Sequence, residues 1–479
     1  MLIAQSGAVN FADGSVWKIV IQFAVLFGAV LLGNILRTTV PFLRKMLIPS
    51  ALLGGIIVLC LKLIPQVNAF LDAEFMQIVT YHCLGLGFAA MALKTEKHKK
   101  SVSTVKIVES GALMAGSYLL QALVGLIISL IFYYLSGSYF AAGLILPMGY
   151  GQGTGSALSW GSNYENNNGF AGGASYGLAV AAIGFLVGSV VGVIYMNILN
   201  KKGKVRPRLS SNQARTVEHF EGENEIPETE SVDKMSVQIC LVIAAYAAAY
   251  GFMQLLQLTG IKALGEVAWG LNFLWALLFA FLLKLAIGGL KKKNVIKRNY
   301  VNNNMMDRIS GLMFDIMIVA GVVAIDFEDI AANLPLLVVT CVIGAITTFI
   351  YVRAVTNQIY PGYELEGFLT NFGTVTGTAS TGMILLREID PDYVTPAATN
   401  IVLQNIPSIA LLAPLLLTLG YAGSDVTHTY VMFGVYFLLF AAYNVFLFRK
   451  KIFKKHYASR PETPWSENDA EQNGALQES

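Results

Sequence analysis

Long apolar segments, separated by short polar or charged ones, run through most of this chain. A helix needs about 20 mainly apolar residues to cross a bilayer. The pattern predicts eleven such spans, at 17–36, 46–64, 76–93, 111–135, 170–199, 237–258, 267–287, 309–324, 334–351, 396–419 and 430–448. We therefore predict an all-α integral membrane protein.

Two segments, 137–168 and 361–388, interrupt this pattern because they are rich in glycine and hydroxyl-bearing residues. The first contains Gly-Gln-Gly-Thr-Gly-Ser-Ala at 151–157, and the second contains Gly-Thr-Val-Thr-Gly-Thr-Ala at 373–379. At an offset of 222 positions (373 − 151), two glycines, a threonine and an alanine coincide. Lipid cannot satisfy the backbone groups of a helix-poor segment, so both segments are expected inside protein or along a watery cavity. Such a pair is typical of secondary-transporter binding sites.

Composition and the placement of positive charge give the chain a direction in the membrane. The 479 residues are 55% hydrophobic and only 13% charged, whereas soluble domains carry about 25% charged residues. Lys and Arg cluster after the first, third, fifth and seventh spans and after the last. The positive-inside rule then places the N-terminus outside and the C-terminus in the cytoplasm. The first five spans start outside and the next five start inside, which predicts an inverted repeat.

This count also predicts the organisation of the chain into two five-helix halves. The N-terminal half covers 1–199 and holds a re-entrant segment at 137–168; the C-terminal half covers 234–419 and holds one at 361–388. A hydrophilic cytoplasmic linker (200–233), an extra helix (420–448) and a basic, then disordered, cytoplasmic tail (449–479) complete the prediction.

The glycine-rich segments and nearby polar residues are the candidate translocation site. Glycines permit close approach of backbone to a ligand, and a half-helix N-terminus can hold a carboxylate. The competing interpretation is that small residues only allow close helix packing, and the amides at 371–405 either contact substrate or tie helices together. The candidate substrate-binding residues are Gly151, Gln152, Gly153, Thr154, Gly155, Ser156, Asn371, Gly373, Thr374, Thr376, Gly377, Thr378, Asn400, Gln404 and Asn405.

A coupling cation would need oxygen ligands from the same region. The candidate cation-binding residues are Thr154, Ser156, Asp315, Thr376 and Thr378. Hydroxyls and freed carbonyls suit Na⁺, which is the only metal ion we expect. Asp315 is a candidate because an intramembrane carboxylate is functional by default; the alternative is a helix-end residue paired with Arg308.

Other polar residues are given peripheral roles. Asn163 and 166–168 are expected in the outer mouth, and Glu109 is expected as an interfacial cap. Arg353 and Arg387 either steer an anion or anchor the chain at the interface. The four cysteines, Cys60, Cys83, Cys240 and Cys341, are expected as buried single thiols.

Several function classes lack their sequence signatures. There is no phosphate-binding loop, no dinucleotide fingerprint and no His-Glu-x-x-His pattern. We therefore expect no enzyme, no organic cofactor and no nucleic-acid partner.

Three places in the chain resemble the bacterial sodium/glutamate symporter family: Ile48-Pro49 with Gly54-Gly55, the Gly151–Gly155 segment, and the Gly373–Gly377 segment. The likeness covers about 17–419 and departs from the family at Val375, the linker and the eleventh span. It implies Na⁺-driven uptake of L-glutamate by alternating access across a bacterial cell membrane. It also implies re-entrant loops at the translocation site, and we expect a homo-oligomer, a dimer.

Other functions stay open on the sequence. One is a Na⁺- or H⁺-coupled carrier of another small carboxylate, and another is a passive anion channel. A third is a membrane-embedded enzyme or non-transporting scaffold, which would move no solute across a sealed vesicle.

Overall fold

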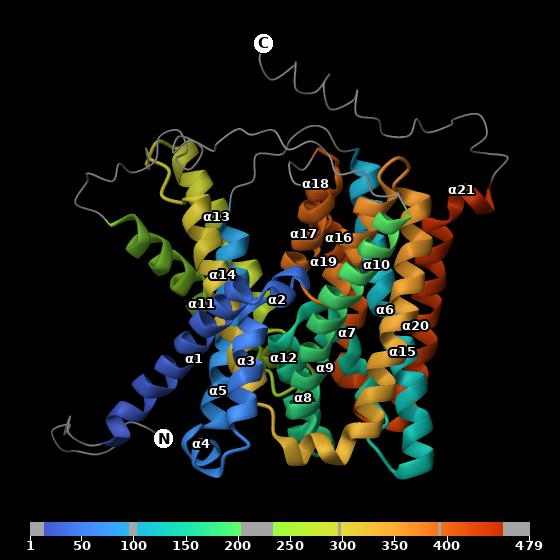
Figure 1. The fold of residues 1–479 in the computed structure, drawn as a ribbon. Helices are drawn as coiled ribbons and strands as arrows, with labels where there is room; N and C mark the ends of the chain where they lie inside the picture. The colour runs from blue at the N-terminus through green and yellow to red at the C-terminus, as the bar shows by residue number, and fades with distance from the viewer. Residues whose placement is uncertain (1–13, 95–102, 203–232, 296–297, 391–393, 454–479) are drawn as a thin grey trace.

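The computed structural model describes the chain except for residues 1–13, 95–102, 203–232, 296–297, 391–393 and 454–479. Most of the expected linker (200–233) and tail (449–479) thus lies outside the described residues. Within the described ranges, the regular elements are helices (Figure 1).

The helices of the N-terminal part end at residue 201. They are α1 (Gly14–Thr39), α2 (Pro41–Lys45), α3 (Ser50–Leu61), α4 (Pro65–Phe70), α5 (Ala73–Leu93), α6 (Thr104–Ser136), η1 (Ala142–Leu144), α7 (Ile145–Gln152), α8 (Thr154–Asn168), α9 (Gly173–Leu186), the π-helix η2 (Val187–Val191) and α10 (Gly192–Lys201).

The helices of the C-terminal part begin at residue 234. They are α11 (Lys234–Leu258), α12 (Lys262–Gly270), α13 (Asn272–Lys292), α14 (Asn303–Val323), α15 (Phe327–Ile359), α16 (Glu364–Thr376), α17 (Ala379–Ile389), α18 (Ala397–Leu403), α19 (Asn405–Ala422), α20 (Val426–Leu447) and α21 (Arg449–Ile452).

Nine of the helical stretches in the described part are long and apolar enough to cross a membrane. They are α1, α5, α6, the continuous α9–η2–α10, α11, α13, α15, α19 and α20. The expected spans at 46–64 and 309–324 are not among these nine. The first became the short α3, and the second became α14, which holds Asp307, Arg308 and Asp315. The chain is a multi-pass membrane protein.

The second expected span is shorter than the sequence pattern suggested, for a local reason. Its helix α3 has 12 residues and is therefore about 18 Å long, too short for a hydrocarbon core of about 30 Å. Pro49 precedes α3, and Pro65 opens the separate helix α4. Between them the buried Lys62 donates hydrogen bonds to the carbonyls of Val323 and Ile325, at 2.9 Å each. This cation occupies the end of α14 and prevents α3 from continuing as an apolar span.

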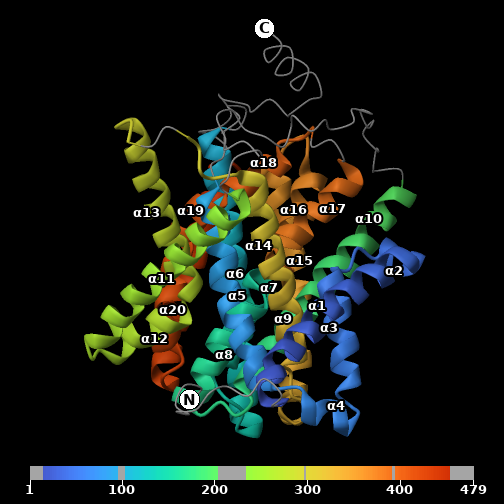
Figure 2. The ribbon, with the colours of Figure 1, turned by 90° about the vertical axis from the view of Figure 1, so that its left-hand side faces the viewer.

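The helices form two groups that pack against each other (Figures 1 and 2). The first group contains α1, α3, α5 and α11–α14, and the second contains α6–α10 and α15–α21. The first group has a small core of its own, formed by α5, α11, α13 and α14 around Ala90, Ala245 and Ala280. A larger core joins both groups, because α5 and α14 also pack on α8. Only two cysteines, Cys83 and Cys341, are buried as expected; Cys60 and Cys240 are exposed on the surfaces of α3 and α11, so the prediction that they are buried was wrong.

Three helices of the second group are interrupted near the middle of the molecule. The chain breaks between α7 and α8 at Gly153 and between α16 and α17 at Gly377 and Thr378. The third interruption is η2, where the helix that begins as α9 widens to a π-helix for five residues. In Figure 1 the α7–α8 pair extends toward the lower end and the α16–α17 pair toward the upper end.

Candidate functional site

The first break depends on a backbone conformation that only glycine adopts easily. Gly153 has φ of 81° and ψ of −167°, a region closed to residues that carry a Cβ. It ends α7 and begins α8. No side chain caps the N-terminus of α8, so the first N–H groups of that helix are available to a ligand.

At the second break, too, one helix ends where the next begins, but the backbone angles differ from those at the first break. Gly377 ends α16, and Thr378 is extended, with φ of −150° and ψ of 170°. The N-terminus of α17 also has no side-chain cap. Each break therefore pairs one helix C-terminus with one helix N-terminus. N–H groups at N-termini favour anions, and carbonyls at C-termini favour cations.

The two breaks meet although they lie more than 200 positions apart. A Cβ placed on Gly153 would lie 3.8 Å from Cγ2 of Thr378. It would also lie 3.9 Å from Cε of Met317 on α14 and 3.5 Å from Cζ of Phe185 on α9. Both glycine-rich segments, α9 and α14 thus converge on one point.

The second break packs so closely on α9 and η2 that side chains would not fit between them. A Cβ on Gly184 would lie 2.6 Å from the carbonyl oxygen of Thr376, and one on Gly188 would lie 2.9 Å from Oγ1 of the same threonine. Gly321 of α14 makes a similar approach to the first break, since its Cβ would lie 2.8 Å from Cβ of Thr154. These glycines let two helices, α14 and the continuous α9–η2–α10, reach the break residues.

A glutamine from α6 fixes the end of α16. The Nε2 of Gln121 donates to the carbonyl of Val375 at 2.9 Å and to Oγ1 of Thr348 at 3.1 Å. Gln121 is fully buried. It therefore satisfies one carbonyl at the break and ties α6, α15 and α16 together.

Several buried oxygens near the breaks have no hydrogen-bond partner among the described residues. They are Oγ of Ser156, Oγ of Ser189, Oγ1 of Thr381, Oε1 of Gln121 and Oε1 of Gln152. Buried polar atoms are normally satisfied, and exceptions call for an explanation such as a bound ion or water. All five are neutral oxygens. The described residues contain no cluster of three or more His, Cys, Asp or Glu, so a cation at the breaks would be held by hydroxyls, amides and carbonyls.

Three of the candidate substrate-binding threonines differ in the hydrogen bonds that their hydroxyls make. Thr374 and Thr376 donate to the carbonyls four residues earlier, Thr370 and Phe372, at 2.7 and 2.6 Å. Thr154 reaches across to the carbonyl of Met317 at 3.4 Å. The hydroxyls of α16 thus serve their own helix, whereas that of α8 contacts α14.

The candidate amides fall into two classes. Asn371 donates to the hydroxyl of Tyr360 at 3.3 Å, and Asn400 donates to that of Tyr363 at 3.0 Å. Their Oδ1 atoms are buried without partners, as are both polar atoms of Gln404. Asn405 instead lies partly exposed, and its Nδ2 donates to the carbonyls of Ile401 and Val402 in the preceding helix α18, at 3.4 Å each.

Asp315 is not brought to the breaks. Met317 faces Gly153, and a residue two positions earlier on a helix lies about 200° around the axis. The Asp315 side chain is exposed and makes no ion pair with Arg308. The structure thus places Asp315 away from the breaks and does not pair it with Arg308.

Glu109 is not the interfacial cap that the sequence suggested. It is 1% exposed and accepts a hydrogen bond at 2.6 Å from Nη2 of Arg449, in the short terminal helix α21. Lys106 lies 3.2 Å and Lys450 3.6 Å from its carboxylate. The extra helix α20 brings α21 to this position, so two of the three basic partners of Glu109, Arg449 and Lys450, lie more than 300 positions away in the sequence.

Gln121, Ser189 and Thr381 are not among the site residues predicted from the sequence. Gln121 carried a usable signal, since it is a polar residue in the middle of an apolar span. Ser189 and Thr381 carried none, because single hydroxyl residues are common in membrane helices and their neighbours are set by the fold.

Comparison with known proteins places the chain in a family. A profile of the sodium/glutamate symporter family matches residues 17–365. The match covers more than half of the chain and includes the first break, and it ends before the second. No curated protein matches the chain. The chain belongs to the sodium/glutamate symporter family, which is a family of transporters and not of enzymes.

Proposed function

Starting from this family membership, we propose that the protein is a Na⁺-coupled symporter that carries L-glutamate into a bacterial cell by alternating access. The observation that carries the proposal is the meeting of the two breaks, in which Gly153 lies against Thr378. Two uncapped helix N-termini at this point suit a carboxylate, and the C-terminal ends of α7 and α16 suit a cation. N-terminus outside, C-terminus inside and a homodimer are parts of the same proposal.

The inverted repeat is supported by the positions of the helices in the sequence. Shifted by 222 positions, Thr104–Ser136 falls on 326–358, and α15 is Phe327–Ile359. The same shift places Gly173–Lys201 on 395–423, where α18 and α19 occupy 397–422. The shift of the two breaks thus extends to the long helices on either side of them.

The packing contacts between helices follow the same correspondence between the two halves. α1 packs on α3 as α11 packs on α13, and α3 packs on α14 as α13 packs on α5. α6 contacts α7 and α19, and its counterpart α15 contacts α16 and α9. Because α6 and α15 run in opposite directions (Figure 1), this correspondence supports an inverted rather than a parallel repeat.

Roles follow from the chemistry of the groups at the breaks. The N–H groups at the start of α8 and α17 bind substrate carboxylates, and carbonyls at the C-terminal ends of α7 and α16 bind Na⁺ with Ser156, Ser189 and Thr381. Gln121 positions the end of α16 for this purpose. Neutral oxygens alone hold Na⁺ weakly, and a bound carboxylate beside it adds the missing negative charge, which makes the binding of the two solutes mutually dependent.

The test is uptake of radiolabelled L-glutamate into proteoliposomes, with an inward Na⁺ gradient or with K⁺ or H⁺ gradients instead. We expect uptake only with Na⁺. Gly153→Ala should abolish it because the added Cβ is incompatible with the backbone angles. Ser189→Ala, a milder change, should raise the Na⁺ concentration needed for half-maximal uptake. The matched control is Gly251→Ala, because a Cβ there meets no atom within 4 Å.

Each other outcome has a distinct meaning. Na⁺-driven movement of another carboxylate, without glutamate, keeps the coupling and rejects the substrate. Glutamate flux that does not depend on a Na⁺ gradient supports a proton-coupled carrier or a channel. No gradient-driven flux of any anion rejects the proposal, and full activity of Gly153→Ala rejects the breaks as the site.

A further inference from the structure

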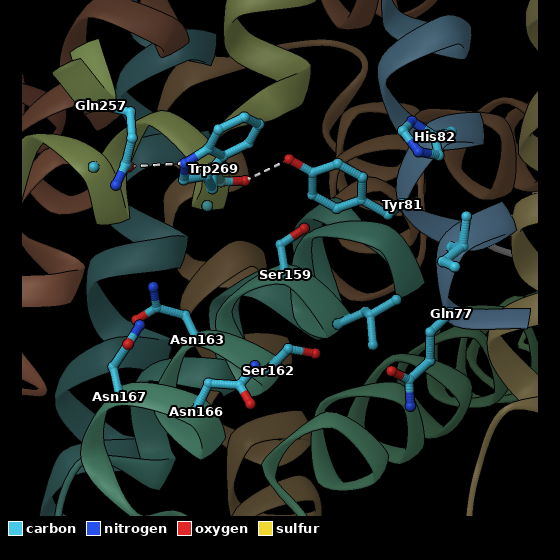
Figure 3. Close-up of a pocket in the computed structure, with 14 residues that line it drawn as sticks. Gln77, Tyr81, His82, Ser159, Ser162, Asn163, Asn166, Asn167, Gln257 and Trp269 are labelled. Atoms are coloured by element: carbon cyan, nitrogen blue, oxygen red, sulfur yellow. Dashed lines mark hydrogen bonds between the residues drawn. The ribbon is translucent and has the colours of Figure 1, made fainter. Parts of the chain in front are cut away.

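A cleft outside the breaks lies between parts of the two helix groups. It has a volume of about 560 Å³ and lies between α5 and α8, with α11 and α12 along its remaining side (Figure 3). Asn166 and Asn167 lie near the end of α8, so the cleft begins toward the end of the molecule at which α4 is found (Figure 1). None of the candidate residues at the breaks lines it.

The described lining of this cleft is mostly apolar by area, but it includes several polar side chains and carries no fixed charge. It contains the amides of Gln77, Asn163, Asn166, Asn167 and Gln257, the hydroxyls of Tyr81, Ser159 and Ser162, and the imidazole of His82. No Asp, Glu, Lys or Arg lines it among the described residues. Amides offer both donors and acceptors, so they can contact an ammonium group and a carboxylate equally well.

The wall formed by α5, α11 and α12 is held together by hydrogen bonds, whereas the wall formed by α8 has a polar atom without a hydrogen-bond partner. Nε1 of Trp269 donates to Oε1 of Gln257 at 3.0 Å, and the hydroxyl of Tyr81 donates to the carbonyl of Trp269 at 2.9 Å (Figure 3). Opposite them, Oδ1 of Asn163 on α8 is buried and has no partner. A ligand in the cleft would therefore meet a rigid aromatic wall and an unoccupied amide.

The polar face of α8 leads from the cleft to the first break. Asn163 and Asn167 follow Ser156 by seven and eleven positions, which places the three residues on one face of the helix. Ser156 lies only three residues from Gly153, and its hydroxyl is buried without a partner. The free polar groups of this face thus extend from the cleft toward the point at which the two breaks meet.

We propose that this cleft is an outer receiving site, in which an anionic amino acid is bound on its way to the breaks. The proposal rests on the function proposed above. A site along a transport path must bind the solute strongly enough for it to enter and weakly enough for it to leave. Amides without a counter-charge meet both needs, whereas an arginine would hold the anion in place. Because α8 and α5 belong to different helix groups, movement between the groups opens or closes the cleft.

The test changes the charge at the mouth of the cleft in both directions. Asn166→Asp should raise the KM for L-glutamate in Na⁺-driven uptake, and Asn166→Lys should lower it. We expect about two- to fourfold each way, the effect of one unit charge about 10 Å away at an effective dielectric constant of about 40 to 80. Both shifts should shrink when ionic strength is raised, and kcat should change less than KM. The matched controls are Asn68→Asp and Asn68→Lys, an exposed position on α4 outside the cleft.

A second variant tests occupancy rather than charge. Ser162→Trp places an indole ring in the cleft and should abolish uptake while the purified protein stays monodisperse. If the wild type moves glutamate with Na⁺ but both Asn166 variants keep its KM, or if Ser162→Trp transports normally, the receiving site is refuted and the proposed function stands. A wild type that moves no glutamate refutes the function and the receiving site together.

Discussion

The buried carboxylate of Glu109 gives the sharpest test of how the chain is held together. Its three basic neighbours lie 2.6, 3.2 and 3.6 Å away, and their side chains are 15, 17 and 26% exposed. At an effective dielectric constant of about 20, these distances correspond to gross attractions of about 6, 5 and 5 kcal/mol. Desolvation offsets most of this, and breaking a buried pair costs about 3–5 kcal/mol in measured cases. We expect Glu109→Gln to cost about 3 kcal/mol, since the partly exposed cations can turn to water.

Removal of Arg449 should cost less than removal of Glu109. Arg449→Gln takes away about two fifths of the gross attraction and leaves Lys106 and Lys450 beside the carboxylate. We therefore expect about 1 kcal/mol for Arg449→Gln. In the double variant the two costs should not add, because the single changes remove one shared interaction.

The assay is equilibrium unfolding in mixed detergent micelles, at low salt and for all three variants. Lys451→Gln is the control, since Lys451 is an exposed cation on the same short helix and should change the free energy of unfolding by less than about 0.5 kcal/mol. The reasoning is refuted if Arg449→Gln destabilises as much as Glu109→Gln, or if the two costs add in full. Either result would mean that α21 does not hold Glu109.

Three further predictions follow from single contacts. Gln121→Leu leaves the carbonyl of Val375 without its donor; it should lower the maximal rate of Na⁺-driven uptake at least tenfold, and normal transport kinetics would contradict its positioning role. Lys62→Met removes the donor to two carbonyls at the end of α14 and should cost about 2–3 kcal/mol in the same unfolding assay; no loss would show that water replaces the ammonium. The hydrogen bond from Lys18 and that from the N–H of Phe75 lower the pKa of Asp72, so its contribution is present above the ordinary pKa of about 4 and is lost as pH falls below it. Asp72→Ala should therefore cost about 1 kcal/mol at pH 7 and progressively less as pH falls below about 4 through the lowered pKa, and a cost that does not decline in acid would rule out the charged cap.

Local and periodic features of this protein were decided by the sequence alone. The apolar runs predicted most of the membrane helices, because a span must be apolar over about 20 residues whatever it packs against. The glycine-rich segments marked the two places at which the apolar helices are interrupted, since Gly153 adopts angles that other residues avoid. The helix-poor backbone expected there was wrong, because α7, α8, α16 and α17 occupy most of both segments. The family followed from the same segments and was confirmed by comparison.

The tertiary structure decided which of these residues meet. Gln121 bonds a carbonyl 254 positions away, and no pattern within one helix records such a partner. Asp315 and Met317 are neighbours in the sequence, yet only Met317 faces the first break, because the rotation of α14 is set by its packing. Glu109 resembled a helix-end residue until α21 was placed over it. Sequence periodicity determines what a helix is, and contacts between distant helices determine which of its faces forms a site.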